Sequence, residues 1–257
     1  MTDNRPLVLL TNDDGIHAEG LRKLKSAAAK LGRVRIVAPE NEQSAVGHSI
    51  TLYDPIKAHE VTKDGRFYGY GIGGTPADSV KLAVHSLLPR SPDLLISGIN
   101  NGANLGINVL YSGTVSAATE AAILGVPAMA VSLAQRKDPP FDWALPHIER
   151  LGAWVLKCGL PRGVALNVNI PAIPPDQIRG FKLTRQGLSK FRESFEQRED
   201  PRGNRYYWLA GEATAAETDQ GVDVTAVKDG YVSVTPLFYD LTAHPYMEEL
   251  TCSLKKL

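Results

Sequence analysis

Two adjacent carboxylates, Asp13 and Asp14, come directly after the first apolar run of the chain, residues 7–10. Neighbouring carboxylates repel each other unless a cation or a proton compensates their charge, and a hard divalent cation with oxygen ligands does so naturally. Mg²⁺ or Mn²⁺ fits this chemistry best. The alternative is local: with Gly15, the two aspartates can form a turn that caps the helix predicted from about Ala18.

A second polar cluster is the long loop at residues 98–113, which contains several asparagines and glycines and leads into Ser112, Gly113 and Thr114 at the start of a predicted helix. Backbone N–H groups at a helix N-terminus, with two hydroxyls and a glycine that permits close approach, form a phosphate-sized anion site. The asparagine amide oxygens are neutral ligands suited to a hard metal. An ordinary capped helix is the alternative, although a loop of this length in a compact domain is more often functional.

A third polar segment, residues 41–49, follows the second apolar strand. Its Ser44 could reach a metal held by the two aspartates. His48 in this segment and His17 behind the aspartates show no zinc-type spacing, so a solvated, capping or structural role is the simpler interpretation of both. Asp78 lies where a carboxylate favours the start of a helix. The roles of His17, His48 and Asp78 stay open.

The elements that must position these clusters alternate between apolar strands and amphipathic helices. Continuous apolar strands of this kind indicate a parallel sheet that is covered on both faces. Ligands bind such a sheet at the carboxyl ends of its strands, and each polar cluster follows a strand at that end. The expected strands are 7–10, 34–38, 68–72, 94–97, 128–133, 164–170 and 232–237, and the expected helices are 18–31 with Gly32 as its cap, 76–88, 114–124, 143–157 and a short one at the C-terminus.

The pattern changes beyond residue 174, where short strands, charged stretches and the aromatic pair Tyr206-Tyr207 predominate. We therefore predict a Rossmann-like α/β catalytic core with three layers at residues 1–175. Residues 176–257 are expected to form a β-rich appendage, a β-hairpin and a C-terminal segment, that completes the core and makes contacts between subunits. Exposed aromatic residues in a hairpin can also pack on their own domain.

The composition excludes several classes of protein. Lysine plus arginine and aspartate plus glutamate each number 28, so the overall field favours neither a nucleic-acid duplex nor an anionic membrane. No apolar run approaches the roughly 20 residues that cross a bilayer. The first residues show neither the basic region nor the apolar region of a signal peptide, so we do not expect secretion. Cys158 and Cys252 match no disulfide or metal pattern, and we expect both to be small buried side chains in a cytoplasmic protein.

Several catalytic signatures are absent from the sequence. It contains no phosphate-binding loop of the nucleoside-triphosphatase type, no dinucleotide fingerprint after the first strand and no nucleophile elbow. The haloacid-dehalogenase phosphatases require Asp-x-Asp after the first strand, and Asn12-Asp13-Asp14 breaks that pattern. A covalent aspartyl-phosphate is therefore not expected.

In combination, the polar clusters closely resemble the SurE family, the stationary-phase survival proteins, which are 5′/3′-nucleotidases. The resemblance also includes residues 167–171, 184–187, 218–219 and 230–237 and so covers nearly the full chain. The segments that carry it most clearly are Leu-Leu-Thr-Asn-Asp-Asp-Gly-Ile at 9–16, Val-Ala-Pro-Glu-Asn-Glu-Gln-Ser-Ala at 37–45, Gly-Thr-Pro-Ala-Asp-Ser-Val at 74–80, Ser-Gly-Ile-Asn-Asn-Gly-Ala-Asn at 97–104 and Tyr-Ser-Gly-Thr-Val at 111–115.

The resemblance implies a Rossmann-like core with one divalent metal ion per subunit, Mn²⁺ or Mg²⁺. The implied metal ligands are Asp13, Asp14, Ser44 and Asn100, of which Asp13, Asp14 and Asn100 are also the implied catalytic residues. Ser112, Gly113 and Thr114 would hold the phosphate, and Asn104 lies in a matching segment as a further substrate contact. The family forms homodimers and homotetramers by exchanging C-terminal segments and pairing hairpins.

The expected reaction is hydrolysis of nucleoside 5′- and 3′-monophosphates by a metal-activated water, with no phosphoenzyme. Short polyphosphate and sugar phosphates stay open as further substrates, and base preference stays open too. The rival interpretation is a non-hydrolytic nucleotide-sensing or partner-binding module that keeps the same anion pocket. Because both aspartates that a metal requires are present, the sequence favours the enzyme.

Overall fold

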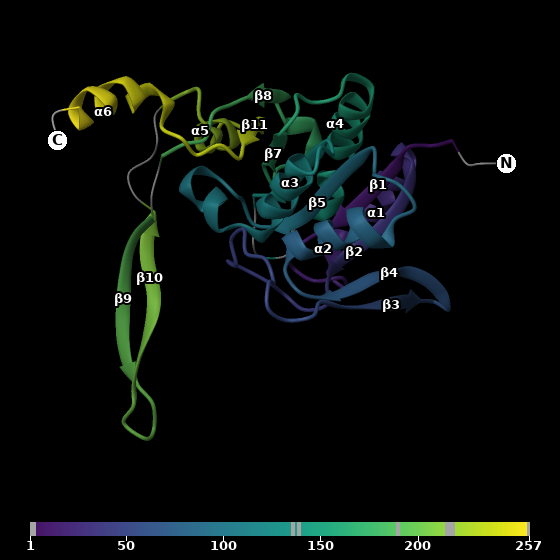
Figure 1. Ribbon diagram of the computed structural model, residues 1–257, viewed down its shortest axis with the longest axis horizontal. Helices are drawn as coiled ribbons and strands as arrows, with labels where there is room; N and C mark the ends of the chain where they lie inside the picture. Colours follow the sequence, from purple (N-terminus) through teal and green to yellow (C-terminus); the bar gives the residue numbers. More distant parts are fainter. Residues whose placement is uncertain (1–3, 135–136, 138–139, 189–190, 214–218, 256–257) are drawn as a thin grey trace.

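The computed structural model describes residues 4–134, 137, 140–188, 191–213 and 219–255. In these ranges one large sheet has nine strands in the order β3-β4-β2-β1-β5-β6-β7-β11-β8, and a separate hairpin pairs β9 with β10. Figure 1 shows the large sheet with helices packed around it and the hairpin projecting from the body of the molecule. The predicted α/β class with a β-rich C-terminal appendage is confirmed.

The strands of the large sheet are β1 (Leu7–Thr11), β2 (Arg33–Pro39), β3 (Lys57–Lys63), β4 (Arg66–Gly73), β5 (Leu94–Asn101), β6 (Ala128–Leu133), β7 (Val164–Ile170), β8 (Phe181–Leu183) and β11 (Val232–Phe238). The hairpin strands are β9 (Phe191–Glu199) and β10 (Arg205–Ala213). The α-helices are α1 (Glu19–Leu31), α2 (Pro76–Leu82), α3 (Gly113–Ile123), α4 (Leu145–Cys158), α5 (Asp223–Lys228) and α6 (Met247–Leu254).

Two apolar clusters fill the two faces of the sheet and make the core three layers deep. One contains the buried residues of α1 and α4, and the other contains those of α2 and α3. Along β1, Val8 and Leu10 belong to the first cluster, while Leu7 and Leu9 belong to the second. A strand that is buried on both faces reads as a continuous apolar run, which is why residues 7–10 could be predicted as a strand.

The sheet is parallel from β4 through β7 and antiparallel at two places near its ends. β3 pairs antiparallel with β4, and β11 pairs antiparallel with β7. Since β8 in turn pairs with β11, the C-terminal part of the chain contributes two strands to the main sheet. The division of the chain at residue 175 stays a prediction.

Local sequence signals fixed the start of α2 correctly. Thr75 accepts a hydrogen bond from the backbone N–H of Asp78, the Asp78 carboxylate accepts one from the N–H of Thr75, and Pro76 lies in the first turn. This capping box satisfies two donors that a helix leaves free. The predicted end at residue 88 was wrong for the α-helix, because the chain changes to a π-helix at Ala83–Leu87.

Three further expectations need correction. β5 does not end at residue 97: after an irregularity it pairs again with β6 and extends to Asn101, which shortens the predicted loop. Helix α4 begins at Leu145 rather than at residue 143, and Pro146 lies in its first turn, where a missing N–H is tolerated. Both cysteines are exposed, so the expectation that they are buried was wrong. Cys158 is the last residue of α4, and Cys252 lies on α6, a helix with no buried residue.

No helix in the described ranges is long and apolar enough to cross a membrane.

The close packing of α1 on β5 gives a test of the fold. A Cβ added at Gly20 would lie 2.1 Å from the carbonyl oxygen of Ile99. The backbone at Gly20 and the carbonyl of Ile99 both belong to packed elements and cannot move apart easily. We therefore expect Gly20→Ala to lower the free energy of unfolding by about 1 to 3 kcal/mol in chemical denaturation. Ser26→Ala on the exposed face of α1 is the control, with an expected change within about 0.5 kcal/mol. Equal stability of Gly20→Ala and the unchanged protein would contradict the packing.

Candidate active site

The carboxylate of Asp13 lies at the end of β1 with only 5% of the residue exposed. Thr114 holds both of its oxygens: the backbone N–H of Thr114 donates to Oδ2 at 2.9 Å, and the hydroxyl donates to Oδ1 at 2.5 Å. Gly113 permits this approach, because a Cβ there would lie 2.7 Å from the Cβ of Asp13. The N-terminus of α3, where N–H groups favour an anion, therefore faces Asp13.

This geometry bears on the turn that was predicted to hold phosphate. Both donors of Thr114 are used on Asp13, and Thr114 is fully buried. Ser112 caps α3, because its hydroxyl accepts from the N–H of Val115 at 3.1 Å. Ser112 lines the adjoining pocket. The phosphate-binding role of Ser112, Gly113 and Thr114 stays a prediction. The observed contacts of Thr114 orient the carboxylate of Asp13.

Burial makes the two aspartates unusual acids. It raises the pKa of Asp13 above its ordinary value, although the hydrogen bonds from Thr114 oppose the shift. Burial is also the main reason why the pKa of Asp14 rises to about 6, and the negative charges of Asp13 and Glu42 add to it. Ionised together at neutral pH, these side chains repel one another, so a cation placed between them would be strongly favoured.

A pocket of about 1010 Å³ opens beside the aspartates. Its lining brings together all four predicted metal ligands with two predicted substrate contacts and with residues from the hairpin. The lining residues are Asp13, Asp14, Glu42, Ser44, Ala45, Asn100–Asn104, Asn108, Tyr111, Ser112 and Leu209–Gly211. The sequence analysis did not single out Glu42, Asn108, Tyr111 or the three hairpin residues. The first three lie in segments that it marked as polar loops, whereas β10 gave no signal of contact with the site.

The donor set fits a hard divalent cation. The side-chain nitrogen of Asn100 donates a hydrogen bond to the carbonyl of Gly102 at 2.7 Å. The side-chain oxygen is therefore the atom that can bind a metal. Each hydrogen-bonded oxygen of Asp13 keeps a further lone pair. Among the described residues no three side chains of His, Cys, Asp or Glu form a metal-binding group. The predicted ligands are therefore two carboxylates and the neutral oxygens of Ser44 and Asn100. Such a set suits Mg²⁺ or Mn²⁺ rather than Zn²⁺.

Asn104 anchors the loop that follows β5. Its backbone N–H donates to Asn169, its side chain donates to Ser132 at 2.8 Å, and its carbonyl accepts from Asn167 and Asn169. These bonds tie the loop to the ends of β6 and β7. Asn104 also lines the pocket, and its role as a substrate contact stays a prediction.

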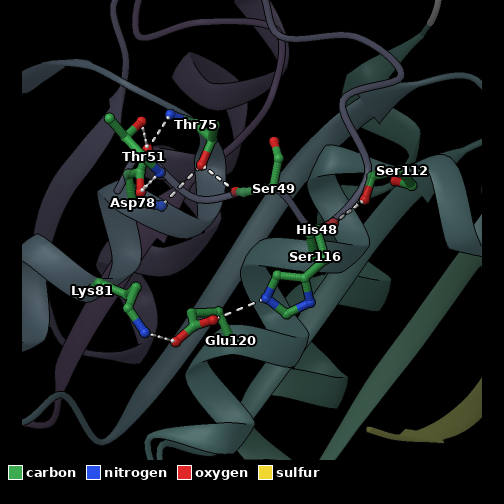
Figure 2. A network of polar contacts seen from close by, with 9 residues as sticks. All are labelled: His48, Ser49, Thr51, Thr75, Asp78, Lys81, Ser112, Ser116 and Glu120. Atoms are coloured by element: carbon green, nitrogen blue, oxygen red, sulfur yellow. Dashed lines mark hydrogen bonds and ion pairs between the residues drawn. The ribbon is translucent and has the colours of Figure 1, made fainter. Parts of the chain in front are cut away.

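The residues whose roles were left open have distinct places. Asp78 completes the capping box of α2 and accepts two further hydrogen bonds from Thr51. His48 contacts the buried carboxylate of Glu120 on α3, with 2.9 Å between Nε2 and Oε2 (Figure 2). His17 is exposed, just before α1.

The sequence model described as Survival protein SurE matches residues 8–193. The chain belongs to the SurE family. A protein named 5′-nucleotidase SurE from Syntrophobacter fumaroxidans is 49% identical over 243 residues, which are 95% of this chain and 97% of that protein. A protein of the same name from Moorella thermoacetica is 48% identical, over 98% of this chain and 97% of its own.

The fold also matches a SurE family structure. The crystal structure of the SurE protein from Aquifex aeolicus superimposes with a TM-score of 0.84 at 42% sequence identity, covering 95% of this chain and 98% of that one. The family resemblance that the sequence motifs indicated is therefore confirmed over nearly the whole chain.

The raised pKa of Asp14 predicts how the stability of the metal-free protein depends on pH. Because its folded-state pKa of about 6 lies above the ordinary value of 3.8, the folded state binds this proton more tightly, and the stability that the group contributes is lost as pH rises from about 4 to 6. In chelator at pH 7.5, Asp14→Asn should therefore be more stable to urea by about 3 kcal/mol, and the difference should shrink towards pH 4.

Asp64→Asn at an exposed turn is the matched control and should behave like the unchanged protein at both pH values. A metal-free Asp14→Asn protein that is less stable at pH 7.5 would contradict the electrostatic argument.

Proposed function

We propose that this protein is a divalent-metal-dependent phosphomonoesterase that hydrolyses nucleoside 5′- and 3′-monophosphates to nucleoside and phosphate. The observation that carries the proposal is the pair of carboxylates, Asp13 and Asp14, which line one pocket, with Asp13 held by Thr114 at the N-terminus of α3. Relatives that share nearly half of their residues with this chain are named 5′-nucleotidases.

The proposed metal site consists of Asp13, Asp14, Ser44 and Asn100, with one Mn²⁺ or Mg²⁺ per subunit. A bound divalent ion supplies a water of lowered pKa and positive charge for the phosphoryl oxygens. Because Thr114 fixes both oxygens of Asp13, this ligand is oriented before metal or substrate arrives. Such preorganisation removes a reorganisation cost from the reaction.

We further propose that Ser112 and Asn104 contact the phosphate from the pocket wall, while Gly113 and Thr114 contribute by holding Asp13. Tyr111 and Leu209 also line the pocket, and both side chains are more than half exposed. Their apolar surface suits the nucleoside part of a substrate. Short polyphosphate is a second class of substrate to include in the assay.

The non-hydrolytic sensor has no specific observation in its favour, because the pocket that would bind the nucleotide also contains both carboxylates. A homodimer or homotetramer remains our proposal for the assembly. It is supported by exposed apolar side chains on the hairpin and on α6, among them Phe195, Trp208, Leu209, Leu250 and Leu254. The cytoplasmic location stays a prediction.

Replacement of either aspartate tests the reaction. Asp13→Asn and Asp14→Asn each remove one negative charge from the metal site, so we expect phosphate release from nucleoside monophosphates to fall at least about 10³-fold in the presence of Mn²⁺. Chelator should abolish the activity of the unchanged protein, and added Mn²⁺ or Mg²⁺ should restore it. Asp64→Asn should keep full activity. Undiminished turnover by Asp13→Asn would rule out the proposed metal site.

A further inference from the structure

Glu120 on α3 is a buried carboxylate to which the proposed reaction gives no task. Only 4% of the residue is exposed. Its two oxygens meet two basic side chains, Lys81 of α2 at 2.8 Å and His48 of the β2–β3 connection at 2.9 Å. Figure 2 shows these side chains reaching Glu120 from different elements. Burial raises the pKa of Glu120, but the bonds from His48 and Lys81 outweigh it and hold the pKa below its ordinary value.

The connection that carries His48, residues 40–56, contains neither helix nor strand, so individual contacts must hold it in place. Near its start, the N–H of Gln43 donates to the carbonyl of Asp13 at 2.7 Å. Further along, the N–H of Gly47 donates to the carbonyl of Tyr111 at 3.1 Å. The bond between His48 and Glu120 follows directly, and it attaches the connection to a buried carboxylate of α3.

The contacts of the next residues continue this attachment. The carbonyl of Ser49 accepts from the hydroxyl of Thr75 at 2.8 Å, and Thr51 donates twice to Asp78. In Figure 2 these contacts lie on one side of His48, while Ser112, which lines the pocket, lies on the other side. They attach the connection to the start of α2, whereas the His48 contact attaches it to α3.

Ser44 lies between the attachments at Gln43 and Gly47, and it lines the pocket beside Asp14. Its hydroxyl donates to Glu42 at 2.6 Å, within the same connection. That bond moves with the loop and cannot fix the loop against the sheet. The position of Ser44 therefore depends on how firmly the neighbouring residues are attached.

We propose that the contact between His48 and Glu120 is a positioning clamp, which holds residues 43–48 against α3 and thereby places Ser44 at the metal site. The role in metal binding rests on the proposed function. His48 acts through Ser44 and touches neither substrate nor metal. Glu120 lies on α3, the helix whose N-terminus also holds Asp13. The segment that contains Ser44 and the carboxylate of Asp13 are therefore both attached to α3.

Lys81 provides a matched control. It pairs with the other oxygen of Glu120, but it belongs to α2, and its removal leaves the loop contact in place. Four variants separate the roles: His48→Ala removes the clamp, His48→Gln keeps a hydrogen-bonding group there, Lys81→Met removes the other partner, and Ser44→Ala removes the ligand. Thermal unfolding checks that each variant is folded.

Two measurements on the protein without substrate test the clamp. In titrations that follow free Mn²⁺ by electron paramagnetic resonance, His48→Ala should weaken Mn²⁺ binding about tenfold, as removal of supporting residues does at other metal sites. His48→Gln should recover part of the affinity, and Lys81→Met should change it less than about twofold. In hydrogen exchange of the metal-free protein, His48→Ala should speed exchange of residues 43–49, whereas Lys81→Met should not.

A double-mutant cycle shows whether His48 acts through Ser44. If it does, adding His48→Ala to Ser44→Ala should weaken Mn²⁺ binding no further, because the ligand that the clamp positions is already gone. Additive losses would overturn the proposal. Unchanged Mn²⁺ affinity in folded His48→Ala, or an equal loss in Lys81→Met, would overturn it as well.

The failure of the proposed function would look different. If the unchanged protein bound no Mn²⁺, the metal site would be wrong, while the exchange measurement would still decide whether His48 and Glu120 hold the loop. Unchanged exchange of residues 43–49 in His48→Ala would then overturn the clamp itself.

Discussion

A buried carboxylate at the end of β1 constrains the rest of the site. Asp13 is nearly inaccessible to water, yet both of its oxygens have donors because the N-terminus of α3 lies against it. Burial raises the pKa of Asp13, and burial together with the charge of Asp13 raises the pKa of Asp14. A divalent cation relieves this repulsion without disturbing the hydrogen bonds. The electrostatic cost of holding two acids side by side is therefore also the basis of the proposed affinity for metal.

The sheet brings the other groups to the same place. β1 lies between β2 and β5 and is parallel to both, so the carboxyl ends of three strands meet. The segment with Ser44 follows β2, and Asn100 lies at the end of β5. The C-terminal part of the chain reaches this end as well. Asp223, which is fully buried, accepts from the N–H of Gly106 at 2.9 Å, at the start of the 3₁₀ helix Gly106–Tyr111 that leads to Ser112.

The parts of this arrangement that depend on neighbours along the chain could be predicted from the sequence. Residues 128–133 and 164–170 are strands at the predicted bounds, because strands buried on both faces are continuously apolar. Thr75 and Pro76 marked the start of α2 through the capping rules. Asp13, Asp14 and Ser44 were expected from polar segments at strand ends, the family resemblance added Asn100, and all four residues line one pocket.

What escaped prediction depends on contacts between distant residues. β5 extends to Asn101 because β6 offers partners for it, and no local pattern signals that pairing. The hydrogen bond that the hydroxyl of Thr114 donates to Asp13, 101 residues earlier, was not predicted. The pair of His48 and Glu120 spans 72 residues. Leu209 reaches the pocket from a hairpin that was expected to make contacts between subunits.

Crystals grown with Mn²⁺ test the central claim most directly, since manganese scatters anomalously and can be located without assumptions about its ligands. The account predicts one strong peak per subunit, about 2.0 to 2.3 Å from a carboxylate oxygen of Asp13 and from one of Asp14, with the hydrogen bonds from Thr114 intact. A map in which the metal binds elsewhere, or in which both carboxylates keep their places with no ion between them, would contradict it.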